Sequence, residues 1–258
     1  MKVMRLFSSI ARSRTRIRCV GFDTALEPAE TLAVVGDIHG CDQLLEALLD
    51  DISSHDPDQL VFVGDYIDRG EKSAAVLDRL YALSQANPAQ AVFLRGNHEE
   101  MLLRFLDNPE QDSRRWLKFG GLQTLASFGI GGINETANAE QAMRARDALA
   151  NALGPDLLTW LRALPSRFTS GNVAVVHAGA DPDLPIAAQS PEVLTWGHRD
   201  FTARPRKDGC WVVHGHTIVA EVSRDQGRIG VDTGAYATGR LSAALIGPNR
   251  FEVLTSTY

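Results

Sequence analysis

Short apolar runs alternate with stretches of helical periodicity in the first part of the chain. Continuous runs of aliphatic and β-branched residues occupy 31–35, 60–63 and 91–94, and apolar residues recur at helical spacing over 44–52 and 73–83. A run of the first kind is typical of a strand that is buried on both faces. Strand, helix, strand, helix, strand at this spacing predicts a parallel βαβαβ unit.

The pattern changes after Pro109. Residues 109–164 have helical character, and the clearest helix is predicted over 139–153, ending at Gly154-Pro155. A hairpin is predicted next, over 166–176. Further short strands predict a second half that is mostly antiparallel sheet; they occupy 211–213, 228–231, 241–246 and 251–254. Because the chain has no internal repeat and no linker, the pattern favours one domain with two packed sheets.

Basic residues gather at the N-terminus of an otherwise acidic chain. The 258 residues include 26 Lys and Arg against 32 Asp and Glu, which gives a net charge of −6. Six of the basic residues precede Cys19 and the first acidic residue is Asp23, so the rest holds 20 basic against 32 acidic residues. We interpret residues 1–25 as a basic tail, with an organelle transit peptide as the alternative, and 26–258 as a single domain. Because the chain after residue 18 is strongly acidic, a nucleic-acid partner is not expected.

The cysteines and the hydropathy of the chain indicate where in the cell the protein is expected. The chain has three cysteines and no C-x-x-C spacing, which fits a reducing environment without a disulfide framework. No apolar run approaches the roughly 18 residues that a membrane helix needs. Polar and Arg residues interrupt the N-terminal segment from Ser8 to Arg18, which argues against a secretory signal. We therefore expect a cytoplasmic protein with no membrane contact.

Polar clusters follow five of the predicted strands. The clusters read GDIHG at 36–40, GDYIDRG at 64–70, RGNHE at 95–99, HAG at 177–179 and HGH at 214–216, and they hold five of the seven histidines. In parallel α/β sheets, sites are built at the carboxyl ends of the strands. We expect these clusters to meet in one site.

The residue types in these clusters suit a pair of divalent cations. Asp37 and His39 are two positions apart, so on an extended segment both side chains can point to one side. A carboxylate such as that of Asp65 can bridge two ions. The candidate ligands are Asp37, His39, Asp65, Asn97, His177 and one of His214 and His216. A nitrogen and oxygen set without thiolates favours Mn, Fe or Zn over Ca.

Taken in order, the five motifs resemble the signature of the phosphoprotein phosphatase family of metallophosphoesterases. The resemblance covers residues 36–216, and residues 232–246 are similar to the closing strands of that family. It implies an α/β fold of the calcineurin-like type, with two packed mixed β-sheets flanked by helices. It also implies a binuclear metal site at the strand ends, with Mn²⁺ as the expected ion and Fe or Zn as alternatives.

The resemblance also implies ligand roles. By position, the first metal would be held by Asp37, His39 and Asp65. The second would share Asp65 and be held by Asn97, His177 and His216. His216 is preferred to His214 because the family's ligand matches the histidine after the glycine of this turn, which leaves His214 as a core residue or a neighbour of the site.

Catalytic roles follow from the same resemblance. His98 resembles the general acid that protonates the leaving oxygen, and Asp68 resembles the carboxylate that orients it. Arg69, Arg199 and Tyr236 resemble residues that bind the substrate phosphate. A hydroxide bridging the two metals would attack in line, so no Ser or Cys nucleophile is expected.

Structural interpretations compete at single positions. A lone Asp after a strand is usually a helix cap, which we expect of Asp42, and Glu99 is expected only to start a helix. A lone buried His is usually a core residue, and Trp116 is expected in the core or flanking a cleft. The functional interpretation prevails because five clusters agree in order and in residue type.

Three functions are consistent with the motifs. A bacterial-type Ser/Thr protein phosphatase acting on a phosphorylated protein or peptide is favoured, because GDYIDRG and the segment from Arg95 to Gly129 resemble small prokaryotic members. A symmetrical dinucleoside tetraphosphate hydrolase, acting on a dinucleoside polyphosphate, is the alternative. A metal-free scaffold is the least favoured, because all six ligand positions are filled. Assays on a phosphopeptide and on diadenosine tetraphosphate would separate the first two.

Overall fold

The computed structural model describes residues 22–248 and 250–258, so most of the expected basic tail lies outside the described residues. The last part of that tail is packed on the domain. The ring of Phe22 meets Trp211 edge-on, with centroids 5.0 Å apart. The indole N–H of Trp211 donates to the carbonyl of Thr24 at 3.0 Å.

One sheet carries the predicted βαβαβ unit. Its strand order is β10-β9-β1-β2-β3, and the bounds are β10 Arg250–Thr257, β9 Arg240–Gly247, β1 Leu32–Val35, β2 Gln59–Phe62 and β3 Ala91–Phe93. Strands β1, β2 and β3 are parallel and are joined by α1 (Asp42–Ser53) and α2 (Ser73–Ala86). Strand β9 is antiparallel to β1, and β10 is antiparallel to β9.

The second sheet contains both antiparallel and parallel strand pairs. Its strand order is β4-β5-β6-β8-β7, and the bounds are β4 Arg167–Ser170, β5 Val173–Val176, β6 Trp211–His214, β8 Arg228–Gly230 and β7 Ser223–Asp225. The predicted β4–β5 hairpin is present, and β7–β8 and β9–β10 are also antiparallel, so the second half is mostly antiparallel as predicted. The parallel pairing of β6 with β5 and with β8 was not predicted. The crossover from β5 to β6 contains only short helices, η2 (Ile186–Ala188) and α7 (Pro191–Trp196), which leave little helical periodicity in the sequence.

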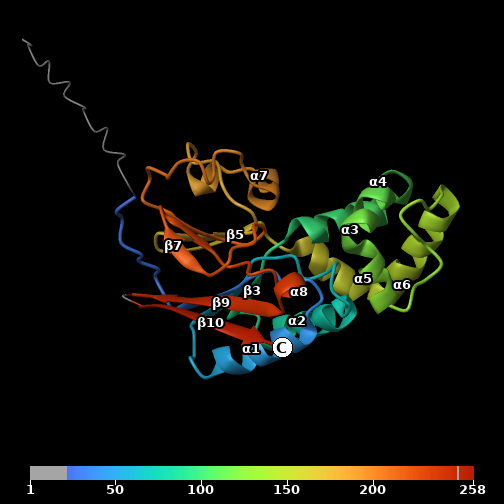
Figure 1. Cartoon of the computed structure of the whole chain (residues 1–258), viewed down its shortest axis with the longest axis horizontal. Coiled ribbons are helices and arrows are strands. Elements are labelled where there is room, and N and C mark those ends of the chain that lie inside the picture. Colours follow the sequence, from blue (N-terminus) through green and yellow to red (C-terminus); the bar gives the residue numbers. More distant parts are fainter. Residues whose placement is uncertain (1–21, 249) are drawn as a thin grey trace, which may run out of the picture.

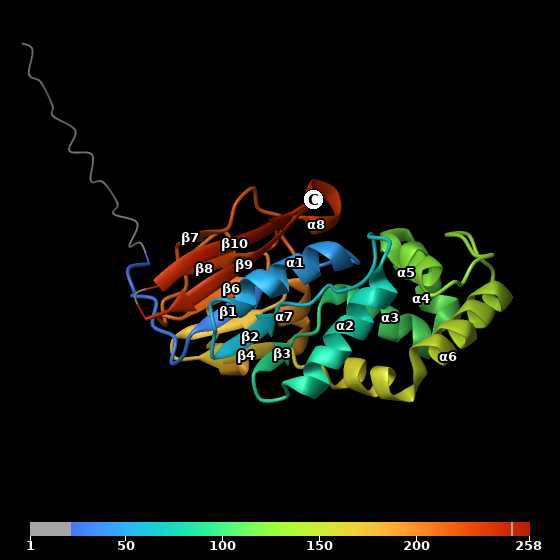
Figure 2. The same ribbon diagram turned by 90° about the horizontal axis from the view of Figure 1, so that it is seen from below.

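The two sheets stack face to face with helices outside (Figure 1), and Figure 2 looks onto the outer side of the first sheet, where α1 and α2 lie in front of the strands. Alternate residues of each strand point to opposite faces. In β1, Leu32 and Val34 pack against Val175 and Val213 of the second sheet, whereas Ala33 and Val35 belong to the core beneath the helices. The fold is therefore α/β, with two mixed sheets flanked by helices as expected.

A helical segment extends beyond the strands at one end of the molecule (Figure 1). It consists of α3 (Asn97–Asp107), α4 (Pro109–Trp116), the π-helical turn η1 (Leu117–Gly121), α5 (Leu122–Ser127) and α6 (Ala139–Ala163). Helix α6 does not stop at Gly154-Pro155. It kinks there, with Gly154 at φ 70°, and resumes, because Pro155 is tolerated in the first turn of the second half.

The role expected of Asp42 was also wrong. Helix α1 begins at Asp42, and the capping position is Cys41, which makes no side-chain cap bond. The carboxylate of Asp42 instead accepts from Nε of Arg79 on α2 at 2.7 Å. Among the described residues, no helix is both long and apolar enough to cross a membrane.

Candidate metal centre and active site

The loops after five strands bring the predicted ligands together. The residues lie just beyond β1 (Asp37, His39), β2 (Asp65), β3 (Asn97), β5 (His177) and β6 (His216). Because β1, β2 and β3 are parallel neighbours, their carboxyl ends open on the same side. The strands of the second sheet add His177 and His216 from above that edge.

The backbone of these loops is unusual. Seven non-glycine residues of the described chain have positive φ, and five of them are site residues: His39 at 46°, Asp65 at 54°, Asp68 at 71°, Arg69 at 66° and His216 at 63°. Such conformations cost free energy and persist where the surroundings hold them, which is commonly at functional sites. The concentration of strain supports a shared function for these loops.

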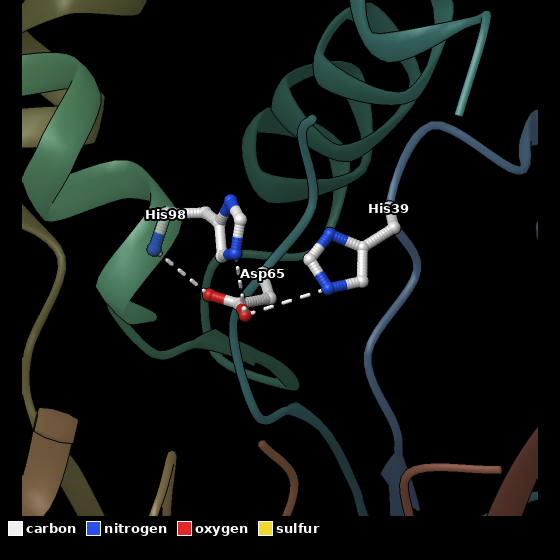
Figure 3. A group of neighbouring side chains, drawn as sticks. All are labelled: His39, Asp65 and His98. Atoms are coloured by element: carbon white, nitrogen blue, oxygen red, sulfur yellow. Dashed lines mark hydrogen bonds and ion pairs between the residues drawn. The ribbon is translucent and has the colours of Figure 1, made fainter. Parts of the chain in front are cut away.

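Asp65 lies at the centre of the site. One oxygen, Oδ2, is 3.5 Å from Nε2 of His39 and 3.8 Å from Nε2 of His98. The other, Oδ1, is 3.4 Å from Nε2 of His177. Figure 3 shows the rings of His39 and His98 approaching this carboxylate from different segments. The two oxygens therefore face two sets of histidines.

Two groups of potential ligand atoms share Asp65. His39, Asp65 and His98 form one group and Asp65, His177 and His216 the other, with all ligand atoms of a group within 4.8 Å of one another. The Oδ1 of Asn97 joins the second group, at 2.9 Å from Nε2 of His177 and 2.8 Å from Nδ1 of His216.

Asp37 lies beside these groups and in neither of them. Its carboxylate is buried and accepts from the backbone N–H of His216, with Oδ2 at 3.0 Å. The approach requires Gly215, because a Cβ there would lie 1.9 Å from Oδ1 of Asp37. Asp37 therefore lies beside the second group, hydrogen-bonded to the backbone of His216 and packed against Gly215.

Hydrogen bonds fix the histidine tautomers in the form that binds metal. Nδ1 of His39 is 2.7 Å from the carbonyl of Ile67, and Nδ1 of His177 is 3.1 Å from that of Val63. A carbonyl only accepts, so Nδ1 carries the proton and the lone pair of Nε2 faces Asp65. Burial lowers the pKa of His39 to about 3 and that of His177 to about 4, so both imidazoles are neutral.

The acidic residues of the site fit bound cations. Burial, then the charges of Asp232 and Asp65, raise the pKa of Asp37 well above its ordinary value. Burial likewise raises the pKa of Asp232 to about 6, and burial with the charge of Asp65 raises that of Glu99 to about 7. Ionised carboxylates at this depth and density need positive charge nearby. Together with the neutral histidines, they suit divalent cations.

Glu99 ties two of the site loops together, a role that the sequence analysis missed. Its Oε2 accepts from the backbone N–H groups of Asp65 at 2.8 Å and Gly96 at 3.0 Å, and its Oε1 accepts from that of Tyr66 at 2.8 Å. Only the bond to Gly96 had a sequence signal, an acidic residue three positions after a helix cap. The hydrogen bonds to Asp65 and Tyr66 join the loop after β3 to the loop after β2, so they have no local signal in the sequence.

His98 differs from the other histidines in its partner. Its Nδ1 lies 2.6 Å from Oδ2 of Asp68, and both side chains are buried. Burial works to lower the pKa of His98, but Asp65 and Asp68 outweigh it, and the pKa is raised. A protonated imidazole repels a cation and can give up a proton. The structure thus separates His98 chemically from His39 and His177.

The remaining predicted residues lie at different distances from this centre. The guanidinium of Arg69 stacks over the ring of Tyr236 at 4.8 Å, and that ring meets His39 edge-on at 5.3 Å. The side chain of Arg199 is 89% exposed, and its nearest acidic partner is Asp200. The structure therefore brings Arg69 and Tyr236 to the site and does not bring Arg199 there. His214 packs edge-on against Phe201 in the core.

Comparisons with known proteins identify a family and similar sequences. The family model for the calcineurin-like phosphoesterases matches residues 30–220. The asymmetrical bis(5′-nucleosyl)-tetraphosphatase PrpE of Oceanobacillus iheyensis is 28% identical over 235 residues, which cover 81% of this chain and 86% of the relative.

Solved structures of two phosphatases share the fold. A cold-active protein-tyrosine phosphatase of a psychrophilic Shewanella aligns with a TM-score of 0.60 at 18% identity, over 90% of this chain and 81% of its own. A protein serine/threonine phosphatase from Saccharomyces cerevisiae aligns with a TM-score of 0.53 at 16% identity, again over 90% and 81%. At these identities the likeness concerns the fold alone.

Proposed function

Because the chain belongs to the calcineurin-like phosphoesterase family, we propose that it hydrolyses dinucleoside polyphosphates at the site around Asp65. Family membership makes the protein a metallophosphoesterase, and the proposal concerns its substrate and the roles of its residues. The observation that supports hydrolysis at this site is the buried His98–Asp68 pair, in which Nε2 of His98 lies 3.8 Å from Oδ2 of the shared Asp65. The choice of a dinucleotide substrate rests on the relatives.

The proposed ligands are the six residues predicted from the sequence. Bound divalent cations would supply an acidified water and would neutralise the charge on the phosphoryl oxygens. Asp65 would be shared between them, since its two oxygens face different histidines. The neutral imidazoles of His39 and His177 offer Nε2 without first losing a proton.

His98 is proposed as the general acid. Its Nδ1 is engaged by Asp68, so Nε2 is the atom from which a proton can pass to the leaving phosphate oxygen. The raised pKa of His98 favours the protonated imidazole that this role requires.

Arg69 and Tyr236 are proposed to bind the substrate. A guanidinium suits two-point contact with phosphate oxygens. Tyr236 is 39% exposed beside it, so its ring is accessible for stacking on a base. Arg199 remains a predicted phosphate ligand, although its side chain is exposed and its acidic partner is Asp200.

The relatives favour the dinucleotide substrate over the phosphoprotein that the motifs first suggested. They are named as asymmetrical bis(5′-nucleosyl)-tetraphosphatases, whereas the sequence analysis considered a symmetrical enzyme. We propose asymmetrical cleavage for this chain. The protein phosphatase remains the second candidate, supported by the Asp68-Arg69 pair within GDYIDRG.

Product analysis tests the proposal. Purified protein loaded with Mn²⁺ would be given diadenosine tetraphosphate and, separately, a phosphoserine peptide, with an Asp65→Asn variant as the inactive control. Formation of ATP and AMP supports asymmetrical cleavage, and ADP alone would assign symmetrical cleavage. Efficient release of phosphate only from the peptide would overturn the dinucleotide proposal. Inactive wild-type protein that binds no metal would identify a scaffold.

A further inference from the structure

Asp68 has more hydrogen-bond partners than a residue that only orients His98 requires. Besides His98 Nδ1, its carboxylate accepts from the indole N–H of Trp116, at 3.1 Å to Oδ1 and 3.0 Å to Oδ2, and from the hydroxyl of Thr124, at 2.6 Å to Oδ1. Its backbone N–H donates to Oγ1 of Thr124 at 2.9 Å and to Oγ of Ser73 at 3.1 Å. Thr124 therefore holds both the side chain and the backbone of Asp68.

Two of these partners, Trp116 and Thr124, come from the helical segment and lie in its interior. Trp116 ends α4 and Thr124 lies in α5, and both side chains are fully buried, as is that of Asp68. Two glycines between them allow the close approach. A Cβ on Gly120, which has φ 117°, would lie 2.5 Å from the backbone nitrogen of Arg69, and one on Gly121 would lie 2.5 Å from the indole of Trp116.

We infer that Thr124 and Trp116 are positioning residues for proton transfer, which hold Asp68 and, through it, the ring of His98. The inference rests on the proposed role of His98 as general acid. It gives the helical segment a part in the chemistry of the site.

The physical argument concerns the orientation of one carboxylate. Asp68 has φ 71°, a conformation that needs support, and its backbone N–H is held by Thr124 and Ser73. With Thr124 and Trp116 donating, the oxygen Oδ2 is directed at Nδ1 of His98. If the hydroxyl of Thr124 were removed, Oδ1 would lose a donor and the backbone N–H an acceptor. The carboxylate could then rotate, and a small misplacement of a catalytic group is costly in rate.

A double-mutant cycle tests the inference. We expect Thr124→Val to lower kcat roughly tenfold or more, since a positioned general acid contributes 10²- to 10⁴-fold. Thr124→Ser should restore most of it, because the hydroxyl remains. In a His98→Asn background, Thr124→Val should change kcat less than about twofold, since the residue acts through His98. Thr159→Val on α6, where the hydroxyl bonds only to the carbonyl of Pro155, is the matched control.

A spectroscopic measurement gives a readout apart from turnover. The Nδ1 proton of His98, in a bond of 2.6 Å, should give a downfield proton resonance that Thr124→Val or Trp116→Phe shifts or broadens and Thr159→Val does not. Equal losses from Thr124→Val in both backgrounds with an unmoved resonance would show a purely structural role and overturn the inference. If His98→Asn alone left kcat unchanged, the proposed acid would fail instead.

Discussion

The buried carboxylate of Glu99 gives a quantitative test of the site without its cations. We consider Glu99→Gln in protein from which divalent metals have been removed by a chelator. Burial and the charge of Asp65 raise the pKa of Glu99 from its ordinary 4.5 to about 7. Between these values the folded protein holds a proton that the unfolded chain has released, so folding stability falls as the pH rises through this range. Glutamine has no such proton.

The expected size follows from the difference between the two pKa values. At about 1.4 kcal/mol per pH unit, wild type should lose about 3 kcal/mol relative to Glu99→Gln as the pH rises from 4 to 8. At low pH the variant should be the less stable protein. The NH₂ group of its side chain replaces an oxygen and cannot accept the hydrogen bonds that backbone N–H groups donate there. The penalty of the variant should therefore shrink steadily as the pH rises.

Urea unfolding at several pH values measures this difference directly. The titrations of His39 and His177 affect both proteins alike and cancel in the comparison. Glu140→Gln, at an exposed position of α6, controls for the loss of a carboxylate as such. With Mn²⁺ bound, the cations favour the ionised carboxylate, and the pH dependence of the difference should disappear. A penalty that stays constant from pH 4 to 8 in chelated protein would refute the reasoning.

Three further predictions concern single residues. Arg69→Gln should lower kcat/KM about a hundredfold, because the guanidinium of Arg69 would no longer hold the transferring phosphoryl group. The same assay on Arg199→Gln tests the other predicted phosphate ligand. An unchanged kcat/KM would show that Arg199 does not bind the phosphate. Tyr236→Ala should raise KM for diadenosine tetraphosphate about tenfold while Tyr236→Phe keeps it, because stacking on a base is worth about 1–3 kcal/mol; equal KM values for both variants would exclude stacking. Gly96→Ala should unfold at markedly lower temperature and lose Mn²⁺ in calorimetric titration, because its Cβ would lie 2.2 Å from Oδ1 of Asp65; unaltered metal affinity would contradict that geometry.

Local patterns in the sequence were enough to predict the three parallel strands of the first sheet and the loops of the site, whereas the pairing of β9 with β1 was not predicted. The β1, β2 and β3 strands are short, apolar and followed by polar clusters, so both their direction and their ends could be read from the chain. The second sheet was harder, because the direction of β6 depends on a crossover with little regular structure. A short irregular connection has no period from which the direction of the next strand can be inferred.

The supporting residues of the site depend on contacts far apart in the sequence. Thr124 meets Asp68 across 56 positions, and Glu99 meets Asp65 across 34. A threonine inside a helix and a glutamate in a first turn have ordinary local explanations, so neither carries a signal of its own. Arg199 is the opposite case: a motif position suggested a role in the site, but the structure shows an exposed side chain.

The reciprocal bonds between the loops after β2 and β3 have a consequence for how the site opens. Glu99 accepts from the backbone N–H of Asp65, and Asp65 in turn accepts from the backbone N–H of His98 at 3.0 Å. Neither loop can leave its place without breaking bonds that hold the other, so the two should open as one cooperative unit, with linked exchange of these amide protons.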